Sequence, residues 1–153
     1  MPRFQIISSF NEHGYKVYGK RFLDSYAKYV SADLPLIVMA EGFDRLFQSP
    51  AAHIEIRKLD QSELWQFVER HQHNPTCHGF VHGYKDKNGQ PLGRDYRYDA
   101  LRYARKVFAL TDPKLDSSDI DIRIWLDADV RFHKQIDASL MAKHLNLDCV
   151  INF

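Results

Sequence analysis

The sequence predicts an α/β fold with a mainly parallel sheet and helices on both faces. Strand-like and helix-like segments alternate from the first residues onward, which is the pattern of a layered α/β domain. The run LIVMA at 36–40 is continuously apolar, as in a parallel strand that is covered on both faces. The run IDIRIWL at 120–126 alternates, becomes apolar and leads directly into Asp127-Ala128-Asp129.

In the first half of the chain, apolar periodicity predicts three further elements. Residues 4–10 read as a buried strand and residues 53–59 as a weaker, alternating one. Between the turn at 11–14 and a stop near 30–33, aromatic side chains recur at steps of three and four, which predicts an amphipathic helix. The residues of this stripe are Tyr15, Tyr18, Phe22, Tyr26 and Tyr29.

A second helix is predicted after the strand at 53–59. Asp60 and Glu63 have the spacing of a capping box, and Leu64, Phe67 and Val68 then fall on one helical face. From about 72 to 94 the pattern dissolves into a loop rich in glycine and proline.

The last third of the chain contains a third helix and the most informative strand. Residues 96–110 form a helical pattern that Thr111-Asp112-Pro113 ends. The face expected to point inward consists of Ala100, Leu101, Ala104, Val107 and Phe108. After the strand at 120–126, we expect a short helix at 138–145 and a final strand at 149–153.

Length, charge and cysteine content limit the function classes. A chain of 153 residues that is 44% apolar can bury one sizeable core, so we expect a single domain over residues 1–153. With 21 basic and 20 acidic residues, no charge excess favours nucleic acid or an anionic membrane as partner. No signal peptide, transmembrane segment or disulfide framework is evident, which predicts a cytoplasmic protein.

Asp127 and Asp129 are the strongest candidates for a site. Ligands of parallel sheets bind beyond the carboxyl ends of the strands, where this pair is expected. Two carboxylates one residue apart suit Mg²⁺ or Mn²⁺, which complete their coordination with water and substrate phosphate oxygens. The alternative is a solvated turn at the end of the strand, because Asp-x-Asp is common in surface turns.

Arg97 is the second candidate. It falls on the inward face of the helix at 96–110, near the helix amino terminus and on the same rim as Asp127, where a guanidinium suits a phosphate or a sugar. A structural ion pair with Asp127 or another carboxylate is an equal alternative. Asp99, Arg102 and Lys106 fall on the opposite face, at spacings typical of solvated ion pairs.

Four residues near the ends of the first two strands are weaker candidates. Tyr15 is placed to stack on a base, although core packing is the more common role of such a residue. Ser8 and Ser9 are placed to meet a phosphate or ribose, or to cap the following helix. Glu41 is placed to accept a hydrogen bond from a base or ribose, or to be a solvated turn carboxylate.

A histidine-rich loop suggests zinc only superficially. Its spacing matches none of the usual structural zinc sites, which favours an exposed loop over a metal centre. The residues concerned are His71, His73, Cys77, His78 and His82.

Three segments together resemble small bacterial and phage glycosyltransferases of the GT-A fold: SSFNEHGYKVYGKRFLDSY, RYDALRYARKVFAL and IWLDADVRFHK. The resemblance implies a Rossmann-like nucleotide half and an Asp-x-Asp motif, here Asp127 and Asp129, that binds Mn²⁺ or Mg²⁺ and the diphosphate of a nucleoside-diphosphate sugar. It implies sugar transfer to an acceptor hydroxyl of a glycan, lipid or protein. Arg97 and Asp99 match a segment that often faces the donor sugar.

The motif lies late in the chain, because only 24 residues follow Asp129. GT-A enzymes continue past the motif into the acceptor site, so we expect an incomplete domain that transfers sugar poorly and pairs or aggregates through an open sheet edge near 149–153. A non-catalytic nucleotide-sugar-binding module is the first alternative. A phosphatase of the haloacid dehalogenase type is the second, although its motif lies on an early strand and needs downstream residues for which no room remains.

Overall fold

The computed structural model describes residues 1–80, 85, 87–90, 93–115 and 118–145. The chain was expected to form one domain, and it divides into two compact units. Unit 1 comprises Met1–Leu59 and Pro113–Phe153, and unit 2 comprises Asp60–Asp112. Unit 2 is therefore a segment inserted between the third and fourth strands of unit 1.

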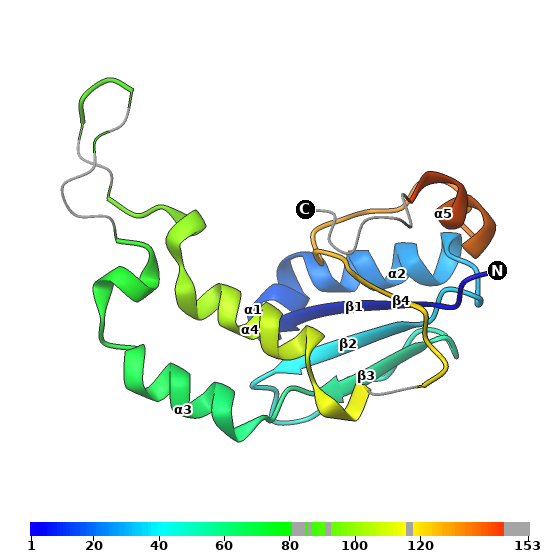
Figure 1. Ribbon diagram of the computed structural model, residues 1–153, viewed down its shortest axis with the longest axis horizontal. Helices are drawn as coiled ribbons and strands as arrows, with labels where there is room; N and C mark the ends of the chain where they lie inside the picture. The colour runs from blue at the N-terminus through cyan, green and yellow to red at the C-terminus, as the bar shows by residue number, and fades with distance from the viewer. Residues whose placement is uncertain (81–84, 86, 91–92, 116–117, 146–153) are drawn as a thin grey trace. The chain divides into compact units, whose positions relative to one another are not determined.

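Unit 1 contains a four-stranded sheet in which every pair of neighbours is parallel, in the order β3-β2-β1-β4 (Figure 1). The strands are β1 Phe4–Asn11, β2 Leu36–Glu41, β3 Ile54–Lys58 and β4 Ile122–Trp125. Helices flank this sheet, so the predicted α/β, Rossmann-like class is confirmed. The predicted strand positions are confirmed to within two residues.

The first strand is central because it is hydrogen-bonded along both edges. Ile6 pairs with Leu36 of β2, and Ile7 pairs with Trp125 of β4. Side chains alternate between the two faces of a strand, so one face of β1 carries Phe4, Ile6 and Phe10 while the other carries Ile7. All four are almost fully buried, as expected for a strand covered on both sides.

A helical run follows β1 directly and covers one face of the sheet. It consists of α1 Glu12–Gly14, the π-helical turn η1 Tyr15–Gly19 and α2 Lys20–Tyr29. It begins earlier than the aromatic stripe indicated, because the Asn11 side chain caps it by accepting a hydrogen bond from the Gly14 N–H at 2.8 Å. The backbone at Gly19 lies so close to Phe10 that an added Cβ would be 3.2 Å from the ring.

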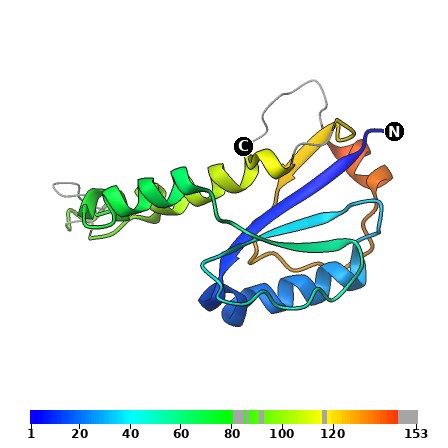
Figure 2. The ribbon, with the colours of Figure 1, turned by 90° about the horizontal axis from the view of Figure 1, so that it is seen from below.

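Two residues of the predicted aromatic stripe, Phe22 and Tyr26, lie on the buried face of α2, which runs along the sheet (Figure 2). The other three, Tyr15, Tyr18 and Tyr29, are partly buried. Phe22, Leu23 and Tyr26 are each at most 2% exposed. The Tyr26 hydroxyl donates a hydrogen bond of 2.8 Å to the Leu34 carbonyl, and burial raises the pKa of this phenol. The helix is thereby fixed to the loop that leads into β2.

The other face of the sheet is met by the short 3₁₀ turn η4 Pro113–Leu115. Arg57 of β3 donates to the Lys114 carbonyl at 2.9 Å, and Arg123 of β4 donates to the Leu115 carbonyl at 2.7 Å. Leu115 is 2% exposed. The segment that re-enters unit 1 is therefore fixed to two strands before β4 begins.

After β4 the chain returns along α2. Ile136 forms a parallel bridge with Val30, and its N–H donates to the Tyr29 carbonyl at 2.9 Å. Helix α5 Ala138–His144 follows, with Asp137 as its cap. The predicted helix at 138–145 is confirmed, and the predicted strand at 149–153 lies outside the described residues.

Unit 2 consists of two helices and short 3₁₀ turns, namely α3 Ser62–His71, η2 Pro75–His78, η3 Tyr96–Tyr98 and α4 Ala100–Leu110. The predicted capping box is wrong by one residue, because Gln61 and not Asp60 occupies the cap position of α3. The Gln61 side chain instead donates to the Phe108 carbonyl at 2.6 Å, which links the start of α3 to the end of α4. Among the described residues, no helix of either unit is long and apolar enough to span a membrane.

The inward face of α4 differs from the predicted one. The helix begins at Ala100, because the Asp99 side chain accepts the Arg102 N–H and caps it there. Leu101 and Ala109 are buried, whereas Val107 is 56% exposed. A start four residues later than expected therefore removes the first predicted turn from α4.

We predict that Tyr26→Phe lowers the free energy of unfolding by roughly 1–3 kcal/mol, because the buried Leu34 carbonyl loses its hydroxyl donor. Urea denaturation followed by circular dichroism measures the change. Tyr29→Phe on the same helix is the matched control, since that ring is only partly buried, and it is expected to change stability by less than about 0.5 kcal/mol. Equal losses in the two variants would contradict a structural role of the Tyr26 hydroxyl.

Candidate functional site

The strand order of unit 1 places a topological switch point between β1 and β4. From β1 the chain moves to β2 and then β3 on one side, and β4 is added on the other side. Open parallel sheets bind ligands beyond the carboxyl ends of the two strands where the order reverses. A ligand site is therefore expected at the residues that follow β1 and β4.

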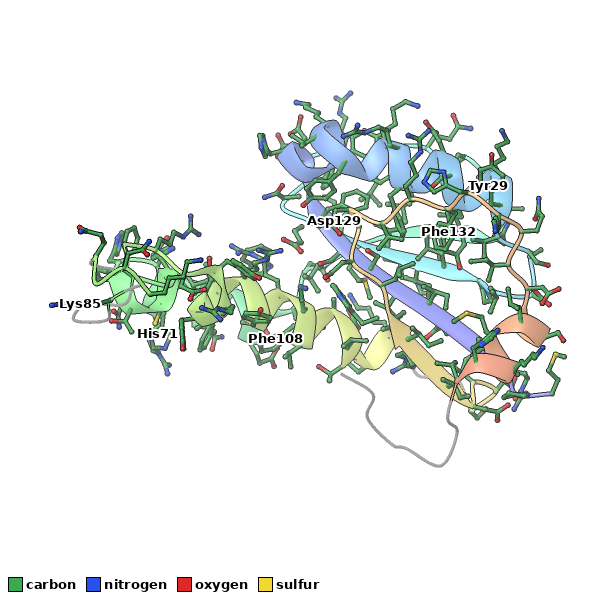
Figure 3. The ribbon with its side chains drawn as sticks, turned by 90° about the horizontal axis from the view of Figure 1, so that it is seen from above. Tyr29, His71, Lys85, Phe108, Asp129 and Phe132 are labelled. Atoms are coloured by element: carbon green, nitrogen blue, oxygen red, sulfur yellow. The ribbon has the colours of Figure 1, made fainter. Side chains whose placement is uncertain are left out.

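Asp127 and Asp129 lie at this switch point. The ladder between β1 and β4 ends with a hydrogen bond of 2.9 Å from the Leu126 N–H to the Ile7 carbonyl. The next residues form a turn in which the Val130 N–H donates to the Asp127 carbonyl at 3.2 Å. Figure 3 labels Asp129 where the chain leaves β4.

The turn holds the two carboxylates outward. Ala128 between them is 6% exposed and belongs to the core, whereas both aspartates are exposed. A buried alanine therefore fixes the middle of the tripeptide while its acidic neighbours face solvent. This arrangement places two hard oxygen donors one residue apart on a turn that the core anchors.

The two carboxylates differ in their partners. Asp127 Oδ1 accepts a hydrogen bond of 2.8 Å from the indole N–H of Trp125. Within the described part of the chain, the Asp129 side chain accepts no hydrogen bond and forms no ion pair. A carboxylate has about four lone-pair positions, so accepting this hydrogen bond does not by itself prevent Asp127 from binding a cation.

A third carboxylate stands at the same rim. Glu41, at the end of β2, accepts a hydrogen bond of 2.5 Å from the Ser9 hydroxyl of β1. Ile7 of β1 pairs with Trp125 of β4. Ser9 and Asp127 each lie two residues further along the chain from Ile7 and Trp125, respectively. Ser9, Glu41 and Asp127 therefore leave three neighbouring strands on the same face of the sheet.

The structure separates the Ser8 side chain from this group. β1 continues to Asn11, and alternation turns the two serines to opposite faces. Ser8 is fully buried on the face that packs against α2, and its hydroxyl has no hydrogen-bond partner among the residues that the structure describes. Neither serine caps the helix, because Asn11 does so.

Tyr15 belongs to an aromatic cluster. Its ring stacks on Phe47 with centroids 4.3 Å apart, and it also contacts Phe10 and Phe43 at 6.0 and 6.3 Å. The side chain is partly buried. Packing in the core accounts for Tyr15, and stacking on a base stays a prediction.

Arg97 does not stand on α4 as predicted. It lies in the 3₁₀ turn η3 of unit 2, 67% exposed, and its guanidinium binds both oxygens of Asp95 at 2.6–3.0 Å. These hydrogen bonds lower the pKa of Asp95 and raise that of Arg97. The structural ion pair left open by the sequence is thus formed with Asp95, and the predicted approach of Arg97 to Asp127 stays a prediction.

Asp99 has a structural role that its spacing concealed. The prediction of a solvated ion-pair face is wrong, because Asp99 is 5% exposed. One carboxylate oxygen accepts the Arg102 N–H at 2.9 Å, and the other binds Arg94 at 2.7 Å. Asp99 therefore caps α4 and fixes the segment before it.

The histidine-rich segment is only partly described. The His71 ring lies 4.6 Å from that of Phe67, and His78 Nε2 is 2.5 Å from the Gln72 carbonyl oxygen. His82 lies outside the described residues. Among those that are described, no three histidine, cysteine, aspartate or glutamate side chains are grouped so that they could hold a metal ion.

Sequence reasoning overlooked the role of Trp125. Residues 125 and 127 are two apart at a strand end and so share a face, and this spacing could have predicted their contact. The indole N–H orients the Asp127 carboxylate by donating to its Oδ1 atom. Trp125 is therefore a positioning residue for the motif.

No protein family, curated protein or solved structure matches this chain.

The Asp95–Arg97 pair gives a testable pH dependence. Because the folded-state pKa of Asp95 is lowered, its stabilising contribution is present above the ordinary aspartate value of about 3.9 and is lost as the pH falls through the folded-state pKa. We expect Arg97→Ala to raise the pKa of Asp95 towards the ordinary value in a carbon-detected NMR titration. Arg102→Ala is the control and should leave it unchanged. An ordinary pKa for Asp95 in the unaltered protein would contradict the pairing.

Proposed function

We propose that the rim at the carboxyl ends of β1, β2 and β4 binds a nucleoside-diphosphate sugar together with Mn²⁺ or Mg²⁺, and that the protein is a glycosyltransferase of the GT-A type. The observation that carries this proposal is the turn at Asp127-Ala128-Asp129. Two exposed carboxylates flank a buried alanine at the switch point of a parallel sheet. The sequence resemblance to GT-A enzymes supports the same assignment.

The charge of the rim explains why a metal is needed. Glu41, Asp127 and Asp129 are acidic, and a diphosphate approaching them alone would be repelled. A divalent cation between the aspartates and the phosphates reverses the sign of that interaction. Metal-dependent binding of the nucleotide is thus a consequence of the residues at this rim.

The donor set fits Mn²⁺ or Mg²⁺ better than a metal held by protein groups alone. No third acidic or histidine ligand joins the aspartates among the described residues. These ions accept few protein ligands when water and phosphate oxygens complete the shell. When bound, the cation supplies Lewis-acid stabilisation of the leaving nucleoside diphosphate.

The remaining rim residues have roles in orientation. Ser9 and Glu41 are hydrogen-bonded to each other, and a hydroxyl and a carboxylate are groups that orient the hydroxyl groups of a ribose or sugar. Trp125 holds one oxygen of Asp127 in place. The acceptor is a hydroxyl group of a glycan, lipid or protein.

We predict that Mn²⁺ tightens the binding of nucleoside diphosphates at least about tenfold, and that Asp127→Ala or Asp129→Ala abolishes the gain. Titration calorimetry with UDP, GDP, ADP and CDP, with Mn²⁺ or with EDTA, measures this. Asp119→Asn is the matched control, since it removes an exposed negative charge before the amino end of β4. An affinity for nucleoside diphosphates that is equal with and without metal would contradict the proposal.

Turnover distinguishes an enzyme from a binding module. Release of nucleoside diphosphate from the preferred nucleotide sugar, dependent on Mn²⁺ and lost in Asp129→Ala, assigns transferase or hydrolase chemistry to the rim. Metal-dependent binding with no release in the presence of diverse acceptors assigns a non-catalytic nucleotide-sugar-binding module. Mass spectrometry of the products then identifies the acceptor.

A further inference from the structure

A groove separate from the rim carboxylates lies between α2 and the segment that follows the Asp-x-Asp turn. Its volume is about 210 Å³. Figure 3 labels two of its residues, Tyr29 on α2 and Phe132 on the returning segment. The lining residues are Arg21, Asp24, Ser25, Lys28, Tyr29, Arg131, Phe132 and His133.

The floor of the groove is firmly built. The Phe132 N–H donates to the Ser25 hydroxyl at 3.2 Å, and that hydroxyl donates to the Phe22 carbonyl at 2.9 Å. The Phe132 ring packs edge-on against Tyr26, with centroids 5.4 Å apart. Because Phe132 points inward, the residues on either side of it, Arg131 and His133, are held at the surface.

The lining has an excess of positive charge. Arg21, Lys28 and Arg131 are permanent cations, and Asp24 is the single acidic side chain. The Asp24 carboxylate is already engaged by Lys20 at 2.7 Å, which reduces its repulsion of an anion. Within the described residues, the Arg131 guanidinium and the His133 ring have no hydrogen-bond or ion-pair partner.

The spacing of these cations selects the kind of anion. Arg21 and Lys28 are seven residues apart on the helical run, which is about 10 Å along its axis. A phosphate ester carries about −1.5 to −2 charges at pH 7, and its oxygens suit the forked guanidinium group. A ligand with one or more phosphate groups therefore matches the positive charge of the lining.

We propose that this groove is a metal-independent binding site for the phosphate groups of a phosphorylated ligand. The site is independent of the function proposed for the rim, because none of its residues is one of the rim carboxylates. A free phosphate ester and a phospholipid headgroup share this chemistry, and the experiment separates them.

The first test uses inorganic pyrophosphate in the presence of EDTA, with the whole chain and calorimetric detection. We expect binding that weakens with salt and falls about tenfold in Arg131→Ala or Lys28→Ala. Asp24→Asn should strengthen it severalfold, because a negative charge leaves the lining. Lys16→Ala is the control, since Lys16 lies outside the groove and pairs with Glu12 at 2.6 Å.

Either of two results with pyrophosphate would overturn the proposal. Pyrophosphate binding that Arg131→Ala and Lys28→Ala leave unchanged, or that needs a divalent metal and is lost in Asp129→Ala, places the anion elsewhere. Circular dichroism of each variant verifies its fold, and Arg131 is exposed, so its replacement removes little packing. A failure of metal-dependent nucleotide binding at the rim would not alter these outcomes.

A second arm identifies the source of the phosphate. Glycerol 3-phosphate is compared with phosphatidylcholine vesicles that contain or lack phosphatidic acid. Binding of the soluble ester that depends on Arg131 assigns a soluble ligand, and Arg131-dependent binding to the acidic vesicles alone assigns a lipid headgroup. If the protein binds neither glycerol 3-phosphate nor the acidic vesicles, and also fails to bind pyrophosphate, the proposed site is rejected.

Discussion

Strand β1 is hydrogen-bonded to a parallel neighbour along both edges and buried on both faces, and the positions of all the rim residues follow from this. Because β2 and β4 are parallel to β1, their carboxyl ends meet at one rim. The register of these ladders brings Ser9 next to Glu41 and sets Asp127 on the same face. A one-residue shift would move each side chain to the opposite face and disperse the group.

The position of the turn after β4 is fixed by two side chains that pack in the core. Ala128 and Phe132 both pack into the core of unit 1, and the chain between them runs from the rim towards α2. The residues next to these two anchors are exposed: Asp127 and Asp129 beside the alanine, Arg131 and His133 beside the phenylalanine. One short segment therefore presents an acidic pair and then a basic pair, which suits first a cation and then an anion.

Periodicity was sufficient to predict strands β1 to β4, the burial of Phe22 and Tyr26 on α2 and the place of the Asp-x-Asp turn. It failed where a side chain near a helix end decided the local structure. Asp99 caps α4 and is buried, whereas spacing alone placed it among solvated charges, because a cap interrupts the helical periodicity. Arg97 was assigned to the wrong element for the same reason. Ser8 was grouped with Ser9, although both lie within the strand expected at 4–10 and alternation along a strand places them on opposite faces.

Paramagnetic broadening by Mn²⁺ tests the central claim most directly, because it locates the ion. In amide NMR spectra of the whole chain with UDP or whichever nucleoside diphosphate binds best, we expect selective broadening of Asn11, Ala128 and Val130, at the carboxyl ends of β1 and β4. We also expect much weaker broadening when the nucleotide is left out, since two carboxylates hold the ion poorly alone. Broadening centred on His71 and His78, or independent of the nucleotide, would contradict the assignment of the rim as the metal and diphosphate site.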